Sequence, residues 1–409
     1  MTITNGVQFI QGGTVTTPAG YRAGATRIGL KTIGEDALDL GILCSDVQCT
    51  AAGVFTTNRI KAAPVVLCQR RLENARAQAL VVNSGCANAC TGPQGASDAE
   101  EMASGTAEKL GLPVEDVLVA STGVIGDPLP MDRVRAGIRS VLLSEDGGHS
   151  LARAIMTTDT KPKEAALRYS AVQDGPEFTI AGIAKGSGMI HPNLATMLCF
   201  LTTDAAVAPA FLRTALKRAA DASFNMVTVD GDTSPNDSVI ILANGLTGNQ
   251  LIDADNTQAE AFQTALTEVC IHLAKSIARD GEGATKLIEV IVEGAATVED
   301  ARLASRTIAG SSLVKTAIHG SDPNWGRIVA ALGRSSIPFD DSALDLHVCD
   351  TCLLRSGCAQ RFDEREVARL LDKPEVLIRV SIKSGGASAT AWGCDMSPEY
   401  VRLNSEYTT

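Results

Sequence analysis

Short apolar segments alternate with longer amphipathic segments along most of the chain, and this alternation restricts the possible folds more than any other pattern. Apolar runs of about four to eight residues are typical of buried strands, and amphipathic runs of about ten or more are typical of helices. No repeat of fixed period is present. We therefore expect an α/β protein, although the alternation does not set the strand order.

The expected elements follow from this periodicity and from glycine and proline punctuation. We expect strands at 79–82, 117–120, 178–184, 196–202, 226–229, 238–242, 287–292, 376–383 and 387–393, and helices at 97–110, 131–143, 208–223, 257–279, 298–308 and 364–371. The last two strands flank Ser384-Gly385-Gly386 and are expected to pair with each other.

The length of 409 residues allows two or more domains and a large buried core. Aromatic residues make up only 4% of the chain, so Ala, Val, Ile and Leu must form most of that core. The net charge of −11 argues against a nucleic-acid surface, which needs clustered Lys and Arg. We find no basic run typical of membrane binding, no targeting segment and no long apolar span. A soluble cytoplasmic protein is expected.

Eleven cysteines are present, but their odd number and the absence of a secretory signal argue against a disulfide framework. Cys349 and Cys352 form one CxxC pair, with His347 and Cys358 nearby. A single pair is weak evidence for zinc, so no metal is expected. Small or apolar neighbours predict reduced core thiols at four other positions, Cys86, Cys90, Cys199 and Cys270.

The segment KGSGMIHPNLATMLCFLTTD, residues 185–204, joins a cation, a glycine loop and a buried strand. Gly186 and Gly188 let backbone approach a ligand closely. Thr196 follows Ala195 at the head of the apolar run, where the loop enters the strand. One interpretation is a glycine loop leading into a core strand. The other is a nucleophile, in which cleavage before Thr196 frees an amine that acts as base for its hydroxyl.

The segment STGVIG, residues 121–126, follows the strand expected at 117–120. Backbone N–H groups at a strand end can stabilise a developing negative charge. An ordinary glycine turn explains the same residues equally well. Neither this segment nor GSG forms the GxGxxG or GK[ST] signature of a phosphate cradle, so nucleotide binding is not expected.

Three polar segments have simpler explanations. DGDTSPND, residues 230–237, departs from the calcium-loop spacing and is expected to be a surface turn. DGEGATK, residues 280–286, ends a helix with glycines as C-caps do, but the carboxylate of Glu282 could also meet an ammonium group. SDPNWGR, residues 321–327, is expected to be structural or to form a rim.

His191 lies five residues before Thr196 and eight before Cys199, so a Thr–His or Cys–His pair is conceivable. Pro192 interrupts this stretch, and the sequence does not show that the side chains meet. The α-amine of a processed Thr196 is the better base, because an α-amino group titrates near pH ~8.

Nine motifs follow one another over nearly the whole chain: TTNRIKAAPV, NSGCANACTG, STGVIG, MTTDT, KGSGMIHPNLATML, DGDTSPND, DGEGATK, SDPNWGR and YVRLNSEYTT. In these motifs the chain resembles the ornithine acetyltransferase family, the bifunctional glutamate N-acetyltransferases of arginine synthesis. The resemblance implies a layered αββα sandwich. It also implies self-cleavage between Ala195 and Thr196 into fragments 1–195 and 196–409, assembled as a heterotetramer of two copies of each.

The resemblance further implies that Thr196 takes the acetyl group of N2-acetylornithine and passes it to glutamate without a cofactor. Thr122 and Gly123 would form the oxyanion hole. Acetyl-CoA is a second donor in bifunctional members, and its use by this chain stays open. The substrate-binding residues implied are Thr158, Lys185, Thr196, Glu282, Asn404 and Thr409. Thr157 and Thr160 share the MTTDT run with Thr158, so the choice among them also stays open.

Two rival functions fit the same residues. An amidase or aminopeptidase would use the processed Thr196 with water as acceptor, whereas a non-enzymatic amino-acid sensor would not need cleavage. The C-terminal segment is expected to be held by apolar contacts of Tyr400, Val401 and Leu403 instead of fraying.

Overall fold

The computed structural model describes residues 7–31, 37–170, 177–191, 197–255 and 257–406. The larger of its two sheets has nine strands: β1 (Val7–Phe9), β2 (Tyr21–Thr26), β3 (Leu40–Phe55), β4 (Arg76–Cys86), β5 (Val117–Val124), β6 (Lys163–Ser170), β7 (Glu177–Lys185), β8 (Leu198–Thr203) and β10 (Ser238–Ala243). The smaller has seven: β9 (Val227–Thr228), β11 (Leu287–Ala295), β12 (Asp345–Val348), β13 (Thr351–Arg355), β14 (Cys358–Ala359), β15 (Glu375–Ser381) and β16 (Ala387–Cys394).

The α-helices in the described residues are α1 (Ala63–Arg71), α2 (Gly92–Leu110), α3 (Met131–Ser140), α4 (Gly148–Ala154), α5 (Pro209–Ala222), α6 (Ala259–Arg279), α7 (Val298–Ala309), α8 (Ser312–His319), α9 (Gly326–Gly333), α10 (Glu364–Leu371) and α11 (Pro398–Glu406). None of these helices is long and apolar enough to span a bilayer. The helix expected at 97–110 begins five residues earlier, at Gly92, because Pro93 suits a first helical turn.

The long strand β3 belongs to both halves of the larger sheet. Its residues 40–45 pair with β2, and residues 50–55 pair with β10. Its register with β4 shifts between Cys44 and Cys49. Such an irregularity bends a strand and increases its twist. The sheet, ordered β1-β6-β7-β8-β10-β3-β4-β5 with β2 beside β3, can therefore fold one half over the other.

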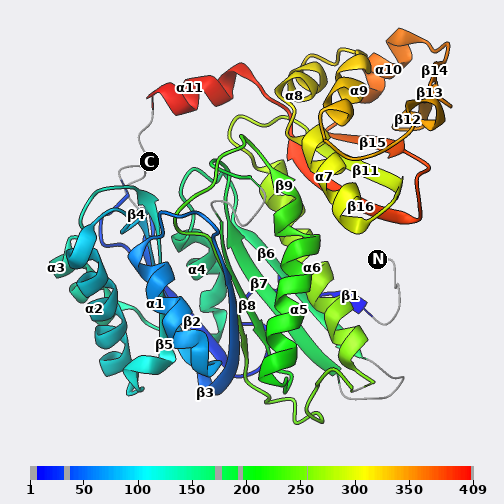
Figure 1. Ribbon diagram of the computed structural model, residues 1–409. Coiled ribbons are helices and arrows are strands. Elements are labelled where there is room, and N and C mark those ends of the chain that lie inside the picture. The colour runs from blue at the N-terminus through cyan, green and yellow to red at the C-terminus, as the bar shows by residue number, and fades with distance from the viewer. Residues whose placement is uncertain (1–6, 32–36, 171–176, 192–196, 256, 407–409) are drawn as a thin grey trace.

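Alternate side chains on these strands face different layers. One set from β4 and β5 packs against one set from β7, β8 and β10, including Leu80, Leu118, Phe200 and Ile240. The opposite faces of β4 and β5 pack on α2 and α3, and those of β7, β8 and β10 pack on α5 and α6. The order helix, sheet, sheet, helix confirms the expected α/β class and αββα sandwich (Figure 1).

Strands from either side of residues 192–196 are neighbours in the larger sheet. β7 pairs antiparallel with β8, which pairs in parallel with β10, and β10 pairs with β3. Strands β8 and β10 therefore lie between strands that come before residue 192. A fragment ending at residue 195 and one starting at 196 would share one hydrogen-bonded sheet.

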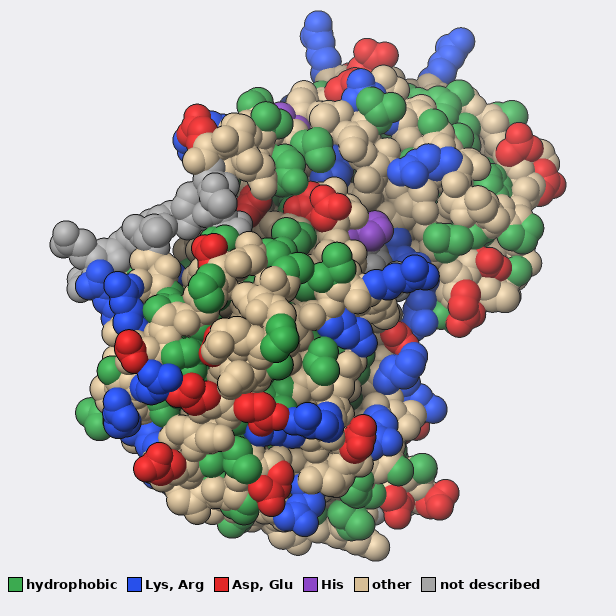
Figure 2. Space-filling model, turned by 60° about the vertical axis from the view of Figure 1, so that its left-hand side comes forward, with side chains coloured by type: hydrophobic (Ala, Val, Ile, Leu, Met, Phe, Trp, Pro, Cys, Tyr) green, Lys and Arg blue, Asp and Glu red, His purple; other side chains and the backbone are tan. Residues whose placement is uncertain are grey.

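The smaller sheet corrects one expected pairing. β15 and β16 do not pair with each other, because β11 lies between them, parallel to β15 and antiparallel to β16. The connection passes over the end of β11, where the carbonyl of Gly294 accepts hydrogen bonds from the N–H groups of Ser384 at 2.6 Å and Gly385 at 2.8 Å. The smaller sheet and its helices form a second lobe, and Figure 2 shows its surface set apart from the larger lobe.

Candidate active site

The ends of several strands surround a polar cavity of about 90 Å³ in the αββα lobe. Lys185 ends β7, Thr122 and Gly123 lie near the end of β5, and the segment before β10 forms another wall. The residues that line it are Thr122, Gly123, Ile125, Thr157, Thr158, Lys185, Gly188, Met189, Ser234, Pro235, Asn236, Glu282 and Asn404. The structure thus brings together every described residue that the family resemblance placed in the substrate site or the oxyanion hole.

Lys185 supplies the buried cation of this cavity. Its side chain is 2% exposed, and its Nζ lies 3.4 Å from the Oγ1 of Thr122. Burial lowers the pKa of Lys185, while the negative charges of Asp159, Asp237 and Glu282 oppose that shift. A carboxylate entering the cavity would restore favourable charge pairing for this ammonium group.

The Thr122-Gly123 pair occupies a close contact between strands. Gly123 has a φ of +132° and stands opposite Gly85 of β4. A Cβ added at Gly123 would lie 2.3 Å from the carbonyl carbon of Gly85, so only glycine fits. The side-chain amide of Asn236 fixes this strand end by donating to the carbonyls of Ser121 at 2.7 Å and Ala87 at 2.6 Å.

The glycine loop after β7 is held by the MTTDT segment. Asp159 accepts hydrogen bonds from the N–H of Gly186 at 2.7 Å and from the Nζ of Lys163 at 2.5 Å. Burial would raise the pKa of Asp159, but the cations of Lys163 and Lys185 and the Gly186 N–H hold it well below its usual range. Lys163 also pairs with Asp280 at 2.6 Å, so one buried cation links the strands to the loop that carries Glu282.

The hydroxyl of Thr158 lies 2.6 Å from the hydroxyl of Ser187 in the glycine loop. Thr157 also lines the cavity, whereas Thr160 donates its hydroxyl to Asp280. Of the three threonines in the run, Thr160 is therefore committed to a structural contact.

Glu282 supplies an anion at the same cavity. Its N–H donates to the carbonyl of Ser187 at 2.8 Å. A Cβ at Gly188 would lie 2.4 Å from the Glu282 carboxyl group, so this glycine permits the close approach. Asn404 donates its side-chain amide to Glu282 at 2.8 Å. The cavity therefore has a cation at Lys185 and an anion at Glu282.

The anchoring of the C-terminal segment differs from expectation. Val401 is 64% exposed, and α11 buries none of its residues. Figure 1 shows α11 as a separate helix that extends from the smaller lobe across the top of the larger lobe. The prediction that apolar contacts hold this segment is therefore wrong for Val401. Polar contacts tie α11 to the cavity region instead: Asn404 donates to Glu282, and Tyr400 forms a side-chain hydrogen bond with Asp230.

The segment DGDTSPND is not the surface turn that its composition predicts, because Ser234, Asn236 and Asp237 are buried. Asp237 accepts a hydrogen bond from the N–H of Met197 at 2.9 Å. Burial raises the pKa of Asp237 well above its usual range. Asp230 accepts hydrogen bonds from Met189 at 2.5 Å and from Ile190 at 2.9 Å. The segment therefore orients chain on both sides of residues 192–196.

Ala195, Thr196 and Thr409 lie outside the described residues. His191 places its Nδ1 3.3 Å from the hydroxyl of Thr228, and Cys199 is fully buried in the core on the α5 and α6 side. In the described part of the chain, His191 thus contacts Thr228, and no hydrogen bond joins it to Cys199.

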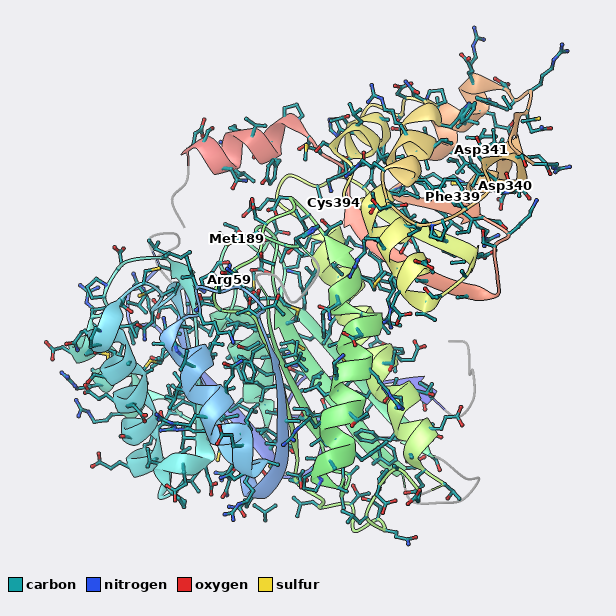
Figure 3. The ribbon with its side chains drawn as sticks, viewed as in Figure 1. Arg59, Met189, Phe339, Asp340, Asp341 and Cys394 are labelled. Carbon is teal, nitrogen blue, oxygen red and sulfur yellow. The ribbon has the colours of Figure 1, made fainter. Side chains whose placement is uncertain are left out.

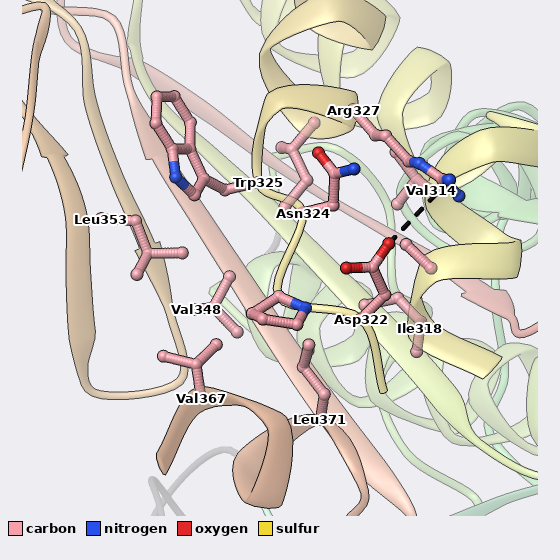
Figure 4. Close-up of a pocket in the computed structure, with 13 residues that line it drawn as sticks. Val314, Ile318, Asp322, Asn324, Trp325, Arg327, Val348, Leu353, Val367 and Leu371 are labelled. Carbon is pink, nitrogen blue, oxygen red and sulfur yellow. Dashed lines mark ion pairs between the residues drawn. The ribbon is translucent and has the colours of Figure 1, made fainter. Parts of the chain in front are cut away.

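Cys90 is exposed and corrects its expected place in the core, whereas Cys86, Cys199 and Cys270 are buried as expected. Within the described ranges, no group of three or more His, Cys, Asp or Glu side chains could hold a metal ion. Trp325 and its SDPNWGR neighbours line a narrow, mainly apolar cleft in the smaller lobe, where Arg327 and Asp322 lie 3.9 Å apart (Figure 4). This cleft shares no lining residue with the polar cavity.

The fold is a four-layer αββα sandwich, and the polar cavity at its strand ends carries both a cation and an anion. Together they define an α/β enzyme suited to a small charged molecule. A model of the ArgJ family matches residues 22–409. The arginine biosynthesis bifunctional protein ArgJ of Dehalococcoides mccartyi is 53% identical over 403 residues, covering 98% of this chain and 99% of that protein. Its counterpart in Symbiobacterium thermophilum is 55% identical over 405 residues, covering 98% and 100%.

Among solved structures, the arginine biosynthesis bifunctional protein ArgJ of Bacillus halodurans is 42% identical, covering 50% of this chain and 97% of its own, with a TM-score of 0.49. The ornithine acetyltransferase of Mycobacterium tuberculosis complexed with ornithine is 38% identical, covering 47% and 100%, with a TM-score of 0.42. The chain belongs to the ArgJ family. It is an acetyltransferase of arginine biosynthesis, which confirms the family and enzyme class expected from its motifs.

The buried charge of Asp159 gives a prediction about stability. Asp159→Asn keeps the shape of the side chain but removes a buried negative charge beside Lys163 and Lys185. The free energy of unfolding should therefore fall by about 3 kcal/mol. Because folding lowers the pKa of Asp159, the extra stability of the wild type over Asp159→Asn should be fully present above about pH 4. It should shrink as the pH falls further. Urea unfolding at pH 7 and at lower pH, with the exposed Asp350→Asn as control, measures this. A stability difference between the wild type and Asp159→Asn that grows as the pH falls would contradict this prediction.

Proposed function

We propose that the enzyme transfers the acetyl group of N2-acetylornithine to glutamate through an acetyl ester on Thr196. The observation that carries this proposal is the convergence of Lys185, Glu282 and the Thr122-Gly123 pair on one cavity. A buried ammonium suits an α-carboxylate, and a carboxylate suits an ammonium group. These are the charged groups that an amino-acid substrate presents around the acetyl amide.

In the proposed reaction, the bond between Ala195 and Thr196 is cleaved first, which gives Thr196 a free α-amine. That amine takes the hydroxyl proton while the Oγ attacks the acetyl carbonyl, and Thr122 and Gly123 stabilise the oxyanion. The amide C–N bond then breaks, and ornithine leaves with the proton. The amine of glutamate attacks the ester, which releases N-acetylglutamate and restores the hydroxyl.

We propose roles for the described residues of the cavity and for Asp237 beside it. Lys185 binds the α-carboxylate, and Glu282, held by Asn404, binds the substrate ammonium group. Thr158 is oriented by Ser187 toward the same cavity. Asp237 is proposed to position Thr196 through the N–H of Met197, the first described residue after it. Thr409 completes the site by family resemblance alone.

We also propose that fragments 1–195 and 196–409 stay associated after cleavage, as a heterotetramer of two copies of each. The shared pairing of β7 with β8 supports association of the fragments. A cytoplasmic location belongs to the same proposal, and it is supported by the free thiols of all eleven cysteines.

Thr196→Ala should abolish processing, because it removes the hydroxyl that serves as nucleophile. On a denaturing gel, the wild type and the exposed control Thr214→Ala should each give two bands, residues 1–195 and 196–409, and Thr196→Ala one band. N-terminal sequencing of the second fragment should begin at Thr196. A different start, or cleavage in the alanine variant, would refute the nucleophile. Formation of acetate in place of N-acetylglutamate would favour the rival amidase.

Asn404→Ala should raise the KM for acetylornithine by about tenfold while processing continues, because a hydrogen bond to a charged group is lost at the substrate site. Ser405→Ala is a matched control, since the Ser405 hydroxyl donates to the carbonyl of Arg402. Steady-state kinetics and a gel measure the two effects. Equal KM values for Asn404→Ala and Ser405→Ala would remove α11 from the site.

A further inference from the structure

Met189 has a strained backbone at the wall of the polar cavity. It lines the cavity, and its backbone φ is +55°, in the left-handed region. Glycine usually occupies this region, because a Cβ there lies too close to the following carbonyl oxygen. The loop already has glycine at two nearby positions, Gly186 and Gly188. A long side chain at position 189, where glycine would fit best, therefore indicates that the side chain itself has a use.

The hydrophobic core does not explain this side chain. Met189 is 38% exposed and belongs to none of the packed apolar clusters that the described residues form. The next residue, Ile190, is 2% exposed and packs in the core on the α5 and α6 side. Ile190 can therefore anchor this end of the loop without any packing by Met189.

Asp230 holds the backbone of Met189 in its left-handed conformation. The Asp230 carboxylate accepts the N–H of Met189 at 2.5 Å and that of Ile190 at 2.9 Å. The N–H of Val229 donates to the carbonyl of Ile190 at 2.8 Å. Tyr400 of α11 forms a side-chain hydrogen bond with the same Asp230. These hydrogen bonds offset the strain at Met189, and the backbone conformation that they hold sets the direction in which its side chain leaves the loop.

Met189 lies close to the charged groups of the cavity. Lys185 stands four residues before it in the same loop, and a Cβ added at the neighbouring Gly188 would lie 2.4 Å from the carboxyl group of Glu282. All four residues line the cavity. Figure 3 shows Met189 at the end of the larger lobe that faces α11. Its side chain is thus available to the part of a bound molecule that lies between a carboxylate at Lys185 and an ammonium group at Glu282.

The described lining of the cavity offers little other apolar surface. Ile125, which is 43% exposed, and Met189 are its two large apolar side chains, and most of the others are polar or small. An amino acid with charged groups at both ends carries methylene groups between them. Contact with these methylene groups would remove the exposed apolar surface of Met189 from water. An unbranched thioether side chain can also adapt to chains of different length.

We propose that Met189 is a specificity-determining residue whose side chain covers the methylene chain of the amino-acid substrate. This inference rests on the proposed function, in which Lys185 and Glu282 bind the charged ends of acetylornithine. The same contact serves the longer chain of ornithine and the shorter chain of glutamate. Because Met189 takes no part in the chemical steps, its removal should weaken substrate binding without slowing the reaction of bound substrate.

Calorimetric titration of the processed protein with ornithine, together with steady-state kinetics with N2-acetylornithine, tests this contact. Met189→Ala removes the side chain but keeps a Cβ at positive φ, whereas Met189→Gly removes both. Met189→Leu is the conservative variant, because it keeps an apolar side chain of similar size. Leu313→Ala is the matched control, because it removes a side chain that is 59% exposed on α8 and does not line the cavity. A denaturing gel and the unfolding midpoint measure processing and folding of each variant.

We expect Met189→Ala and Met189→Gly to raise the KM for acetylornithine and the Kd for ornithine by at least about fivefold, because apolar contact is lost. The kcat should change by less than about twofold, because no reacting group is removed. Met189→Leu and Leu313→Ala should resemble the wild type. Met189→Gly should unfold at the same temperature as Met189→Ala or higher, because glycine is unstrained at positive φ.

Wild-type values of KM and Kd in Met189→Ala would overturn the contact. A rise in Met189→Gly alone would also overturn it, because the backbone and not the side chain would then be responsible. A fall in kcat with an unchanged KM would overturn it as well. Loss of ornithine affinity in Met189→Ala, for an enzyme whose wild type forms no acetyl ester on Thr196, would keep the contact and refute the proposed acetyl transfer instead.

Discussion

The antiparallel pairing of β7 with β8 sets the geometry on which the candidate site depends. Six residue pairs join these strands, from Ile180 with Thr203 to Lys185 with Leu198. Every residue of β8 is buried. The pairing places the buried cation of Lys185 opposite the start of β8, two positions after Thr196. Because β8 is paired on both edges, backbone hydrogen bonds and core packing would hold a new chain end there after cleavage.

Pairing of buried charges holds the other segments of the site together. Lys163 and Lys185 are buried, and isolated buried charges are costly. Asp159 lies between the two cations, and Lys163 shares its charge with Asp280 near the Glu282 loop. The strands and two loops are therefore linked through a few charged groups. Lys185 has no carboxylate within ion-pair distance in the described residues, which leaves it available to a substrate carboxylate.

Much of the fold was predictable because buried strands and amphipathic helices carry strong periodic signals. The αββα order came from family resemblance, since it depends on the bend of β3, which no local pattern reveals. The pairing of β15 with β16 was predicted wrongly because Ser384-Gly385-Gly386 has the composition of a hairpin turn, whereas β11 enters from far away in the sequence.

The candidate site was also predicted only in part. Lys185, Glu282 and Asn404 were placed through motif resemblance. The buried roles of Asn236 and Asp237 were missed because Asp, Asn, Ser and Gly also make surface turns. Their position just before a strand of buried residues was the signal available. The exposure of Val401 could not be predicted from the sequence either, because α11 is tied through Asn404 to Glu282, more than a hundred residues away in sequence.

The central claim is that the acetyl group passes through Thr196. Intact-mass measurement of the processed enzyme, incubated with N2-acetylornithine and no glutamate, tests it directly. We predict that fragment 196–409 gains the mass of one acetyl group, that peptide mapping places it on Thr196, and that added glutamate removes it. An unmodified fragment during active turnover, or an acetyl group on another residue, would contradict the account.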